Sequence, residues 1–368
     1  MRSPVRSIAT SWALWVPAIA IVLLVATWGR ELGGVIVVIV GLLLAGTVLA
    51  AVQHAEVVAH RVGSLLGSLV LAVAVTVIEV ALIVSLMVSG GPEKASLARD
   101  TVFAALMITC NGIVGVSLLV AALRRRVVVF NPEGTGAALA TIAALATLSL
   151  VLPTFTTSTP GPTFSGAQLV FAAIASLGLY TLFVFVQTVR HREDFLPASA
   201  DGAQNAPTRD SDSDRPSSRA AWISLGMLAV ALIAVVGLSK AVSPALESAV
   251  REAGLPLTFV GVVIALLVLL PESIAAVRAA VRDQIQTSFN LAYGSAMASI
   301  GLTIPVIAVA SIWLAFPLEL GLSSVEMVLL ALTVVVGVLT VTPGRATLLQ
   351  GGVHVAVFTG FIVLAVSP

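Results

Sequence analysis

The chain is poor in charged residues and has a single cysteine. Only 10% of its 368 residues are Asp, Glu, Lys or Arg, whereas 58% are hydrophobic and the mean hydropathy is +1.09. A water-soluble enzyme needs a more polar surface, so that class is excluded. The formal net charge of +1 provides no basic field for binding nucleic acid. Cys110 cannot form an internal disulfide, and in its apolar run we expect a small core residue.

Long apolar runs occupy most of the sequence. A helix crosses a bilayer core of about 30 Å with about 20 apolar residues, because lipid offers no partners for backbone N–H and C=O groups. The sequence therefore predicts an all-α polytopic membrane protein with about eleven transmembrane helices. The expected spans are 12–28, 33–52, 64–89, 101–123, 136–153, 166–189, 221–240, 256–280, 289–316, 323–341 and 346–366.

The positive charges divide unevenly between the two sides of the membrane that this count defines. Of the nineteen Lys and Arg residues, five fall on the side opposite the N-terminus: Arg30, Lys94, Arg99, Lys240 and Arg251. Since cytoplasmic loops are enriched in Lys and Arg, we expect a cytoplasmic N-terminus and an external C-terminus. The expected location is the plasma membrane, with lipid as the surrounding partner.

One hydrophilic stretch divides the chain. Residues 190–220 are rich in Asp, Arg, Ser, Pro, Ala and Gly, which is typical of a disordered linker, here on the cytoplasmic side. Residues 1–30 then form an extra N-terminal helix, and 31–189 and 221–368 each contain five spans. Because corresponding spans run in opposite directions, the pattern predicts two inverted five-helix repeats, as in many secondary transporters.

Two acidic residues lie in the middle of predicted spans. Glu79 is central in 64–89, and Glu272 is central in the equivalent helix of the second half, 256–280. An ionised carboxylate at mid-membrane costs about 2.5–3.5 kcal/mol on insertion scales, and the sequence places no basic residue at that depth. We therefore expect the pair to bind a mobile cation when ionised and protons when the cation leaves. In the alternative interpretation each is a neutral acid that donates a hydrogen bond between helices.

Several neutral side chains could supply further oxygen ligands to the cation. Thr76 lies one turn before Glu79, and Thr109, Asn111, Ser295 and Ser299 lie on the next helices of the two halves. Each could equally serve helix packing. His354 is a candidate proton carrier, or a packing residue with its polar atoms satisfied. No cofactor is expected apart from the transported cations and protons.

The second half carries a specific set of motifs. These are Leu269-Leu-Pro-Glu-Ser273, the run Gly294 to Pro305, and Thr342-Pro-Gly-Arg-Ala-Thr347 followed by Gly351-Gly352 and His354. Together with Val77-Ile-Glu79 they resemble the bacterial ChaA-type calcium/sodium–proton antiporters of the cation/calcium exchanger superfamily. The resemblance implies an eleven-span exchanger in which Glu79 and Glu272 bind calcium and protons alternately.

The chain departs from the superfamily in one respect. A Gly-Asn-x-x-Glu pattern is common there, but Thr76 and Leu269 stand where the two asparagines would fall. The loss of both carboxamides weakens the expectation of calcium and makes sodium or potassium more credible.

The resulting hypothesis is a secondary active antiporter, and not an enzyme, that exports Ca²⁺, Na⁺ or K⁺ in exchange for protons. A passive cation channel with a carboxylate constriction is the alternative. An intramembrane enzyme lacks its motifs, such as His-Glu-x-x-His. The preferred cation, the stoichiometry and the oligomeric state are left open.

Overall fold

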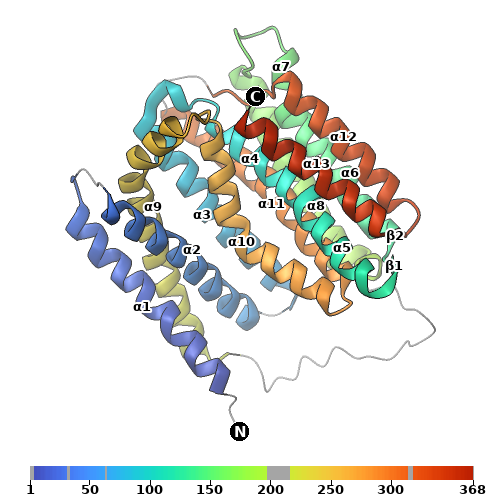
Figure 1. Ribbon diagram of the computed structural model, residues 1–368, viewed down its shortest axis with the longest axis horizontal. Coiled ribbons are helices and arrows are strands. Elements are labelled where there is room, and N and C mark those ends of the chain that lie inside the picture. The colour runs from blue at the N-terminus through green and yellow to red at the C-terminus, as the bar shows by residue number, and fades with distance from the viewer. Residues whose placement is uncertain (1–3, 31–33, 63, 197–215, 314–317, 368) are drawn as a thin grey trace. The chain divides into compact units, whose positions relative to one another are not determined.

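The computed structural model describes residues 4–30, 34–62, 64–196, 216–313 and 318–367 (Figure 1). Nearly all of them are helical. The helices and strands are α1 (Pro4–Thr27), α2 (Val35–Val62), α3 (Ser64–Gly90), α4 (Leu97–Met107), α5 (Val114–Arg125), β1 (Val127–Val129), α6 (Pro132–Ala146), α7 (Leu152–Phe155), α8 (Gly166–Phe185), α9 (Ser218–Glu252), α10 (Phe259–Val281), α11 (Ile285–Ala310), α12 (Ser324–Val341), β2 (Arg345–Thr347) and α13 (Leu348–Val366).

The predicted fold class is confirmed. Among the described residues, nine helices are long and apolar enough to cross a membrane, and two shorter apolar helices span Trp12–Thr27 and Val73–Val88. Each corresponds to one of the predicted spans. The central part of the predicted linker, 197–215, lies outside the described residues. At its edges, residues 192–195 form a short 3₁₀ helix and α9 begins at Ser218.

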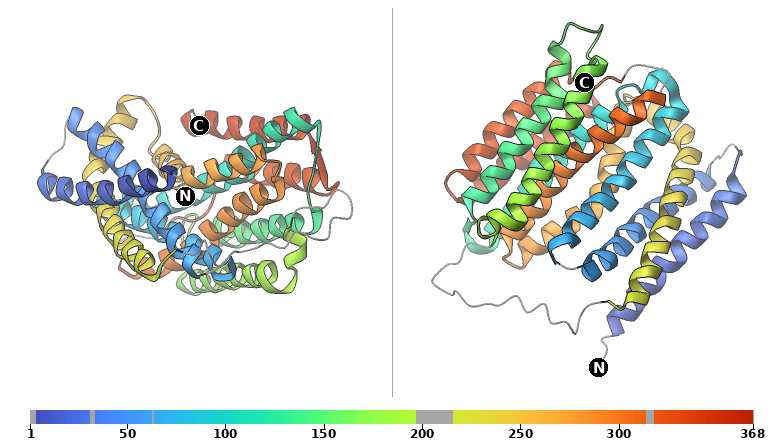
Figure 2. Two further views of the ribbon diagram at one scale, coloured as in Figure 1. Left: turned by 90° about the horizontal axis from the view of Figure 1, so that it is seen from below. Right: turned by 180° about the vertical axis from the view of Figure 1, so that it is seen from behind.

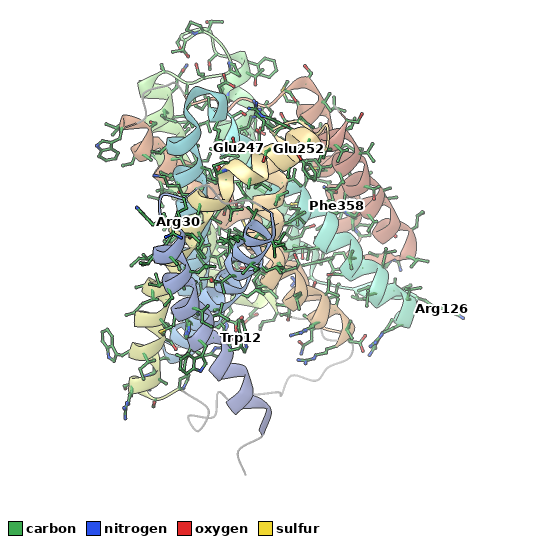
Figure 3. All side chains as sticks on the ribbon, turned by 60° about the vertical axis from the view of Figure 1, so that its left-hand side comes forward. Trp12, Arg30, Arg126, Glu247, Glu252 and Phe358 are labelled. Carbon is green, nitrogen blue, oxygen red and sulfur yellow. The ribbon has the colours of Figure 1, made fainter. Side chains whose placement is uncertain are left out.

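The chain divides into two compact units, and each contains segments from both sides of the hydrophilic stretch. The first unit, residues 1–90 and 207–254, contains α1, α2, α3 and α9. Its helices pack closely: α2 contacts the other three, and His54 Nε2 of α2 lies 3.0 Å from the carbonyl oxygen of Ala13 in α1. A Cβ on Gly237 of α9 would lie 2.4 Å from a methyl carbon of Leu24, so glycine allows α1 to approach α9. Trp12 begins the apolar part of α1, and Arg30 lies three residues beyond its end at Thr27 (Figure 3).

The second unit, residues 91–206 and 255–368, contains the remaining helices. Helices α12, α6, α8 and α11 lie side by side in that order when viewed from behind (Figure 2). Helices α4 and α5 contact α10, α11 and α13, and most of the apolar part of Leu97–Arg125 is buried. This continuous segment is therefore the centre of the unit. Edge-to-face ring contacts, such as Phe130 with Phe289 at 4.9 Å, fill its core.

A small antiparallel ribbon, which the sequence did not predict, joins two turns of the second unit. Val127, Val128 and Val129 of β1 pair with Thr347, Ala346 and Arg345 of β2. Arg126 and Gly344, with φ of 61° and 64°, turn the chain into the two strands. Only Val128 and Ala346 are buried, so one face of the ribbon covers the helix ends.

An ion pair lies next to this ribbon. Arg125 binds Asp283, in the turn between α10 and α11, through two hydrogen bonds of 2.9 and 3.0 Å. The guanidinium lowers the pKa of the Asp283 carboxyl below its usual range, chiefly by hydrogen bonding. Arg124 donates to the carbonyl of Val281 at 2.7 Å, so consecutive arginines fasten α5 to the end of α10.

Candidate cation site

Glu79 lies in the apolar interior of the first unit. Its side chain, on α3, is 3% exposed, and Thr76, one turn earlier on the same helix, is 4% exposed. The surrounding residues Ile78, Leu82 and Ile83 are buried as well. A carboxylate in such surroundings requires compensation by hydrogen bonds, a cation or a proton.

Glu272 lies on α10 of the second unit and is partly buried, directly after Pro271. Proline lacks the N–H that would continue the helical bonding, and the Ser273 hydroxyl donates to the carbonyl of Leu269 at 2.7 Å. Glu79 and Glu272 thus belong to different units, and the sharing of one ion between them stays a prediction.

A π-helical segment joins α4 to α5, and it contains two of the predicted ligand residues. This segment, η2 (Ile108–Ile113), includes Thr109 and Asn111, both fully buried, and packs against α10, α11 and α13. π-Helical turns inside α-helices are frequent at functional sites. The Thr109 hydroxyl lies 2.8 and 3.0 Å from the carbonyl oxygens of Ala105 and Leu106, so it bonds within its own helix. Cys110 is 1% exposed, the core position expected for it.

The structure brings Asn111 and His354 together, which the sequence did not predict. Asn111 Nδ2 donates to the Thr333 hydroxyl at 2.9 Å, so its Oδ1 faces His354 Nδ1 at 3.2 Å as an acceptor. The proton of a neutral His354 ring therefore lies on Nδ1, and Nε2 accepts from the Thr340 hydroxyl at 3.1 Å. The four side chains are between 0% and 2% exposed. This arrangement favours the packing role that the sequence left open for His354, and proton binding there stays a prediction.

Thr333 and Thr340 are members of this network that sequence reasoning missed. They lie seven residues apart on α12, and therefore on one face of an otherwise apolar helix. A single threonine in an apolar helix usually bonds to its own backbone and does not indicate a polar network. The spacing of the two is therefore the one sequence signal that could have identified them. Thr333 also bonds to its own backbone, since its hydroxyl donates to the carbonyl of Leu329 at 2.8 Å.

Glycines hold α13 against the π-helical segment. A Cβ on Gly115 of α5 would lie 2.9 Å from the backbone nitrogen of Val355, and one on Gly351 of α13 would lie 2.9 Å from that of Leu119. A Cβ on Gly112 would contact the ring of Phe358, which is labelled in Figure 3. The backbones of α5 and α13 therefore touch, which fixes the position of His354 relative to Asn111.

Helix α11 carries the last two predicted ligands. Ser299 is 3% exposed and Ser295, four residues earlier on the same face, is partly buried. A hydrogen bond of 2.8 Å between the hydroxyls of Ser288 and Ser117 fastens α11 to α5. Within the described part of the chain, no three His, Cys, Asp or Glu side chains gather into a group that could hold a metal ion.

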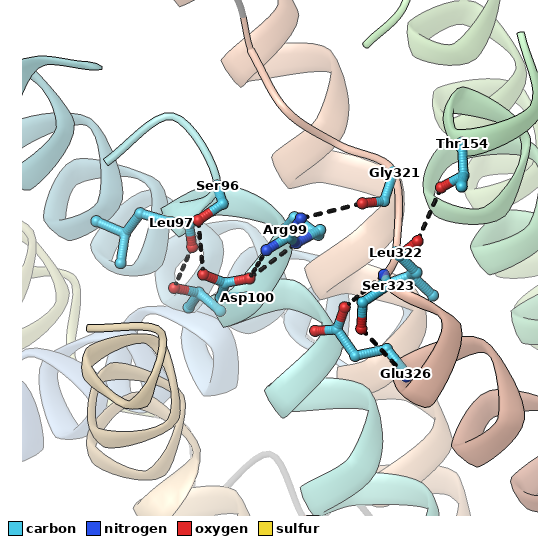
Figure 4. Close-up of polar contacts among 10 residues, drawn as sticks. Ser96, Leu97, Arg99, Asp100, Thr154, Gly321, Leu322, Ser323 and Glu326 are labelled. Carbon is cyan, nitrogen blue, oxygen red and sulfur yellow. Dashed lines mark hydrogen bonds and ion pairs between the residues drawn. The ribbon is translucent and has the colours of Figure 1, made fainter. Parts of the chain in front are cut away.

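Asp100 is a buried acidic residue that lies outside the predicted spans. It is 6% exposed near the start of α4 (Figure 4). Arg99 and Ser96 donate to its carboxylate at 2.8 and 2.9 Å, and Arg99 also donates to the carbonyl of Gly321 at 3.1 Å. The span begins at Leu97, before the predicted residue 101, and so includes this pair. Arg99 is therefore a resident counter-ion for Asp100.

We expect His354→Leu to destabilise the protein by about 1–3 kcal/mol for each polar group left without its partner, here Asn111 Oδ1 and the Thr340 hydroxyl. Thermal unfolding in detergent measures this loss. Thr359→Val is the control, because Thr359 is exposed on the same helix and bonds to the carbonyl of Val355. Equal unfolding temperatures for the two variants would contradict the network.

Comparison with known proteins identifies the family. The sequence profile described as "Sodium/calcium exchanger protein" matches residues 32–189 and 223–367. A Sinorhizobium fredii protein, y4hA, is 47% identical over 89% of this chain and 87% of its own length. The Escherichia coli sodium-potassium/proton antiporter ChaA is 32% identical over 94% of this chain and 93% of its own length. The structure of native YfkE shares the fold with a TM-score of 0.69 at 15% identity, covering 96% of this chain and 98% of the other. The chain is a multi-pass membrane protein that belongs to the sodium/calcium exchanger family.

Proposed function

We propose that the protein is a cation/proton antiporter that exports a cytoplasmic cation in exchange for external protons. The observation that carries this proposal is Glu79, a carboxyl group 3% exposed in the middle of an apolar helix, with a counterpart, Glu272, in an apolar helix of the other half. Both acids lie within the residues that match the exchanger family. An acid so placed is an expected binding group for a transported cation.

The same two groups would couple the cation to protons. In the ionised form the carboxylates bind the cation together with oxygens from Thr76, Thr109, Asn111, Ser295 and Ser299. When the cation leaves, protonation removes the cost of two buried negative charges. A site that holds either a cation or protons, and alternates between the two sides of the membrane, exchanges one for the other.

The proposed cations are Ca²⁺, Na⁺ and K⁺. Two carboxylates with neutral oxygens suit a hard cation such as Ca²⁺. Thr76 and Leu269 stand where the superfamily pattern has two asparagines, so two amide oxygens that would help to coordinate a divalent ion are absent from those positions. A relative 32% identical over nearly the whole chain is named for sodium and potassium, which supports including the alkali cations.

The proposed placement is the plasma membrane, with the N-terminus in the cytoplasm and the C-terminus outside. It rests on the uneven distribution of Lys and Arg between the two sides. The five helices before and the five after the hydrophilic segment would form the inverted halves, residues 31–189 and 221–368, that rearrange around the cation.

A cation panel tests the proposal. Inverted vesicles that contain the protein are energised to form a pH gradient, and Ca²⁺, Na⁺, K⁺ or Mg²⁺ is added in turn. The expected result is that Ca²⁺, Na⁺ or K⁺ dissipates the gradient, with saturation at low rate. Cation flux that neither saturates nor responds to the pH gradient would indicate a channel instead.

A further inference from the structure

A pocket of about 500 Å³ lies in the first unit, between the end of α1 and the middle of α9. Leu24, Ala241 and Pro244 form an apolar wall of the pocket, while Trp28, Arg30 and Lys240 supply an indole and two cationic groups. No acidic side chain is among the described residues that line it. The pocket is thus amphipathic and positively charged.

The position of the pocket along the helices corresponds to a layer of lipid headgroups. Helix α9 begins at Ser218, which receives a hydrogen bond of 2.8 Å from Arg61 at the far end of α2. Lys240 lies about 33 Å along the axis from Ser218, roughly the thickness of a hydrocarbon core. Arg30 follows the end of α1 (Figure 3) and lines the same pocket as Trp28, a residue that is 68% exposed. Tryptophans typically occupy this interfacial layer.

Arg30 and Lys240 differ in their partners from the other three basic residues predicted on the side of the membrane opposite the N-terminus. Arg99 has a carboxylate partner, and Lys94 and Arg251 have polar or electrostatic contacts of their own. Within the described part of the chain, neither Arg30 nor Lys240 forms an ion pair. Two like charges in one pocket attract an anion, and a guanidinium with an ammonium group is suited to the oxygens of a phosphate.

We propose that this pocket binds the phosphate of an anionic phospholipid, whose acyl chains extend along the apolar wall. The bound lipid would join α1 to α9. Helix α1 precedes the residues that match the exchanger family, which begin at residue 32. The lipid would thus fasten this additional helix to the family fold, a role separate from the proposed exchange of cations.

Lipid titration tests the proposal without reference to transport. The purified protein is titrated in detergent with phosphatidylglycerol, phosphatidylcholine or inorganic phosphate, and binding is measured by native mass spectrometry and by thermal unfolding. Phosphatidylglycerol should bind and raise the unfolding temperature, whereas phosphatidylcholine and inorganic phosphate should not. The double variant Arg30→Gln/Lys240→Gln should bind phosphatidylglycerol about thirtyfold more weakly, because each cation contributes about 1 kcal/mol to the binding of an anionic lipid.

Two further variants separate charge from structure. Arg30→Lys/Lys240→Arg retains both charges and should retain binding. Arg126→Gln/Arg345→Gln removes two exposed cations elsewhere in the chain and should leave binding unchanged. Unaltered phosphatidylglycerol binding by the Arg30→Gln/Lys240→Gln variant would overturn the proposal. Equal binding of phosphatidylcholine, or competition by inorganic phosphate, would overturn the assignment to an anionic lipid.

Discussion

Replacing Glu79 or Glu272 with Gln is expected to reduce proton-coupled cation flux at least tenfold, roughly the effect of losing 1.4 kcal/mol of stabilisation of the bound cation. Glutamine keeps the size of the side chain but can neither carry the negative charge nor take up a proton. Flux of Ca²⁺, Na⁺ or K⁺ driven by a pH gradient in vesicles measures the effect. The double variant should be no more active than empty vesicles.

The unfolding temperature of each variant shows whether a loss of flux comes from the binding site or from unfolding of the protein. Glutamine keeps the size and an acceptor oxygen of the Glu79 side chain, which is 3% exposed, so Glu79→Gln should leave the unfolding temperature close to that of the wild type. Glu133→Gln is the matched control, because Glu133 is exposed in the first turn of α6. It should exchange cations like the wild type. Near-normal exchange by both site variants would disprove the proposed role of the pair.

Gly351→Ala is expected to destabilise the protein by about 1–3 kcal/mol, the usual cost of inserting a carbon atom into a packed interface. The added Cβ would lie 2.9 Å from the backbone nitrogen of Leu119 and 3.1 Å from Cβ of Leu118. Backbone atoms cannot move aside as a flexible side chain can. Helix α13 would therefore have to shift away from α5, and thermal unfolding in detergent would record the loss.

The next residue provides a control of identical chemistry. A Cβ on Gly352 has no neighbour within 4 Å, and alanine stabilises a helix interior relative to glycine by about 0.5–1 kcal/mol. Gly352→Ala should therefore leave the unfolding temperature unchanged or raise it. If the two substitutions have equal effects, the close contact between α5 and α13 is absent.

The membrane spans could be predicted because each is a local property of the sequence. Length and hydropathy define a span irrespective of its neighbours, so each of the nine long and two shorter apolar helices in the described part of the chain corresponds to a predicted span, with errors at the ends. The predicted start at residue 101 is too late, because a charged residue such as Asp100, considered alone, indicates the edge of a span. Its partner Arg99 allows the helix to begin earlier.

The arrangement of the candidate site depended on contacts that no local pattern encodes. Glu79 stood out because a carboxyl group in an apolar run is costly wherever it lies. By contrast, His354 and Asn111 are 243 residues apart, and their meeting depends on glycines at which α5 and α13 touch. The π-helical segment likewise has no distinctive sequence, since Ile108 to Ile113 continues an ordinary helical pattern.

The ribbon of β1 and β2 constrains the order in which the chain can assemble. Residues 127–129 leave the ribosome long before residues 345–347, and their backbone partners do not exist until the turn after α12 has been synthesised. Until β2 has been synthesised, the N–H and C=O groups of β1 that later pair with it must bond to water instead. Pairing with β2 is consequently one of the last steps of biogenesis, and a chain truncated before Arg345 would lack it.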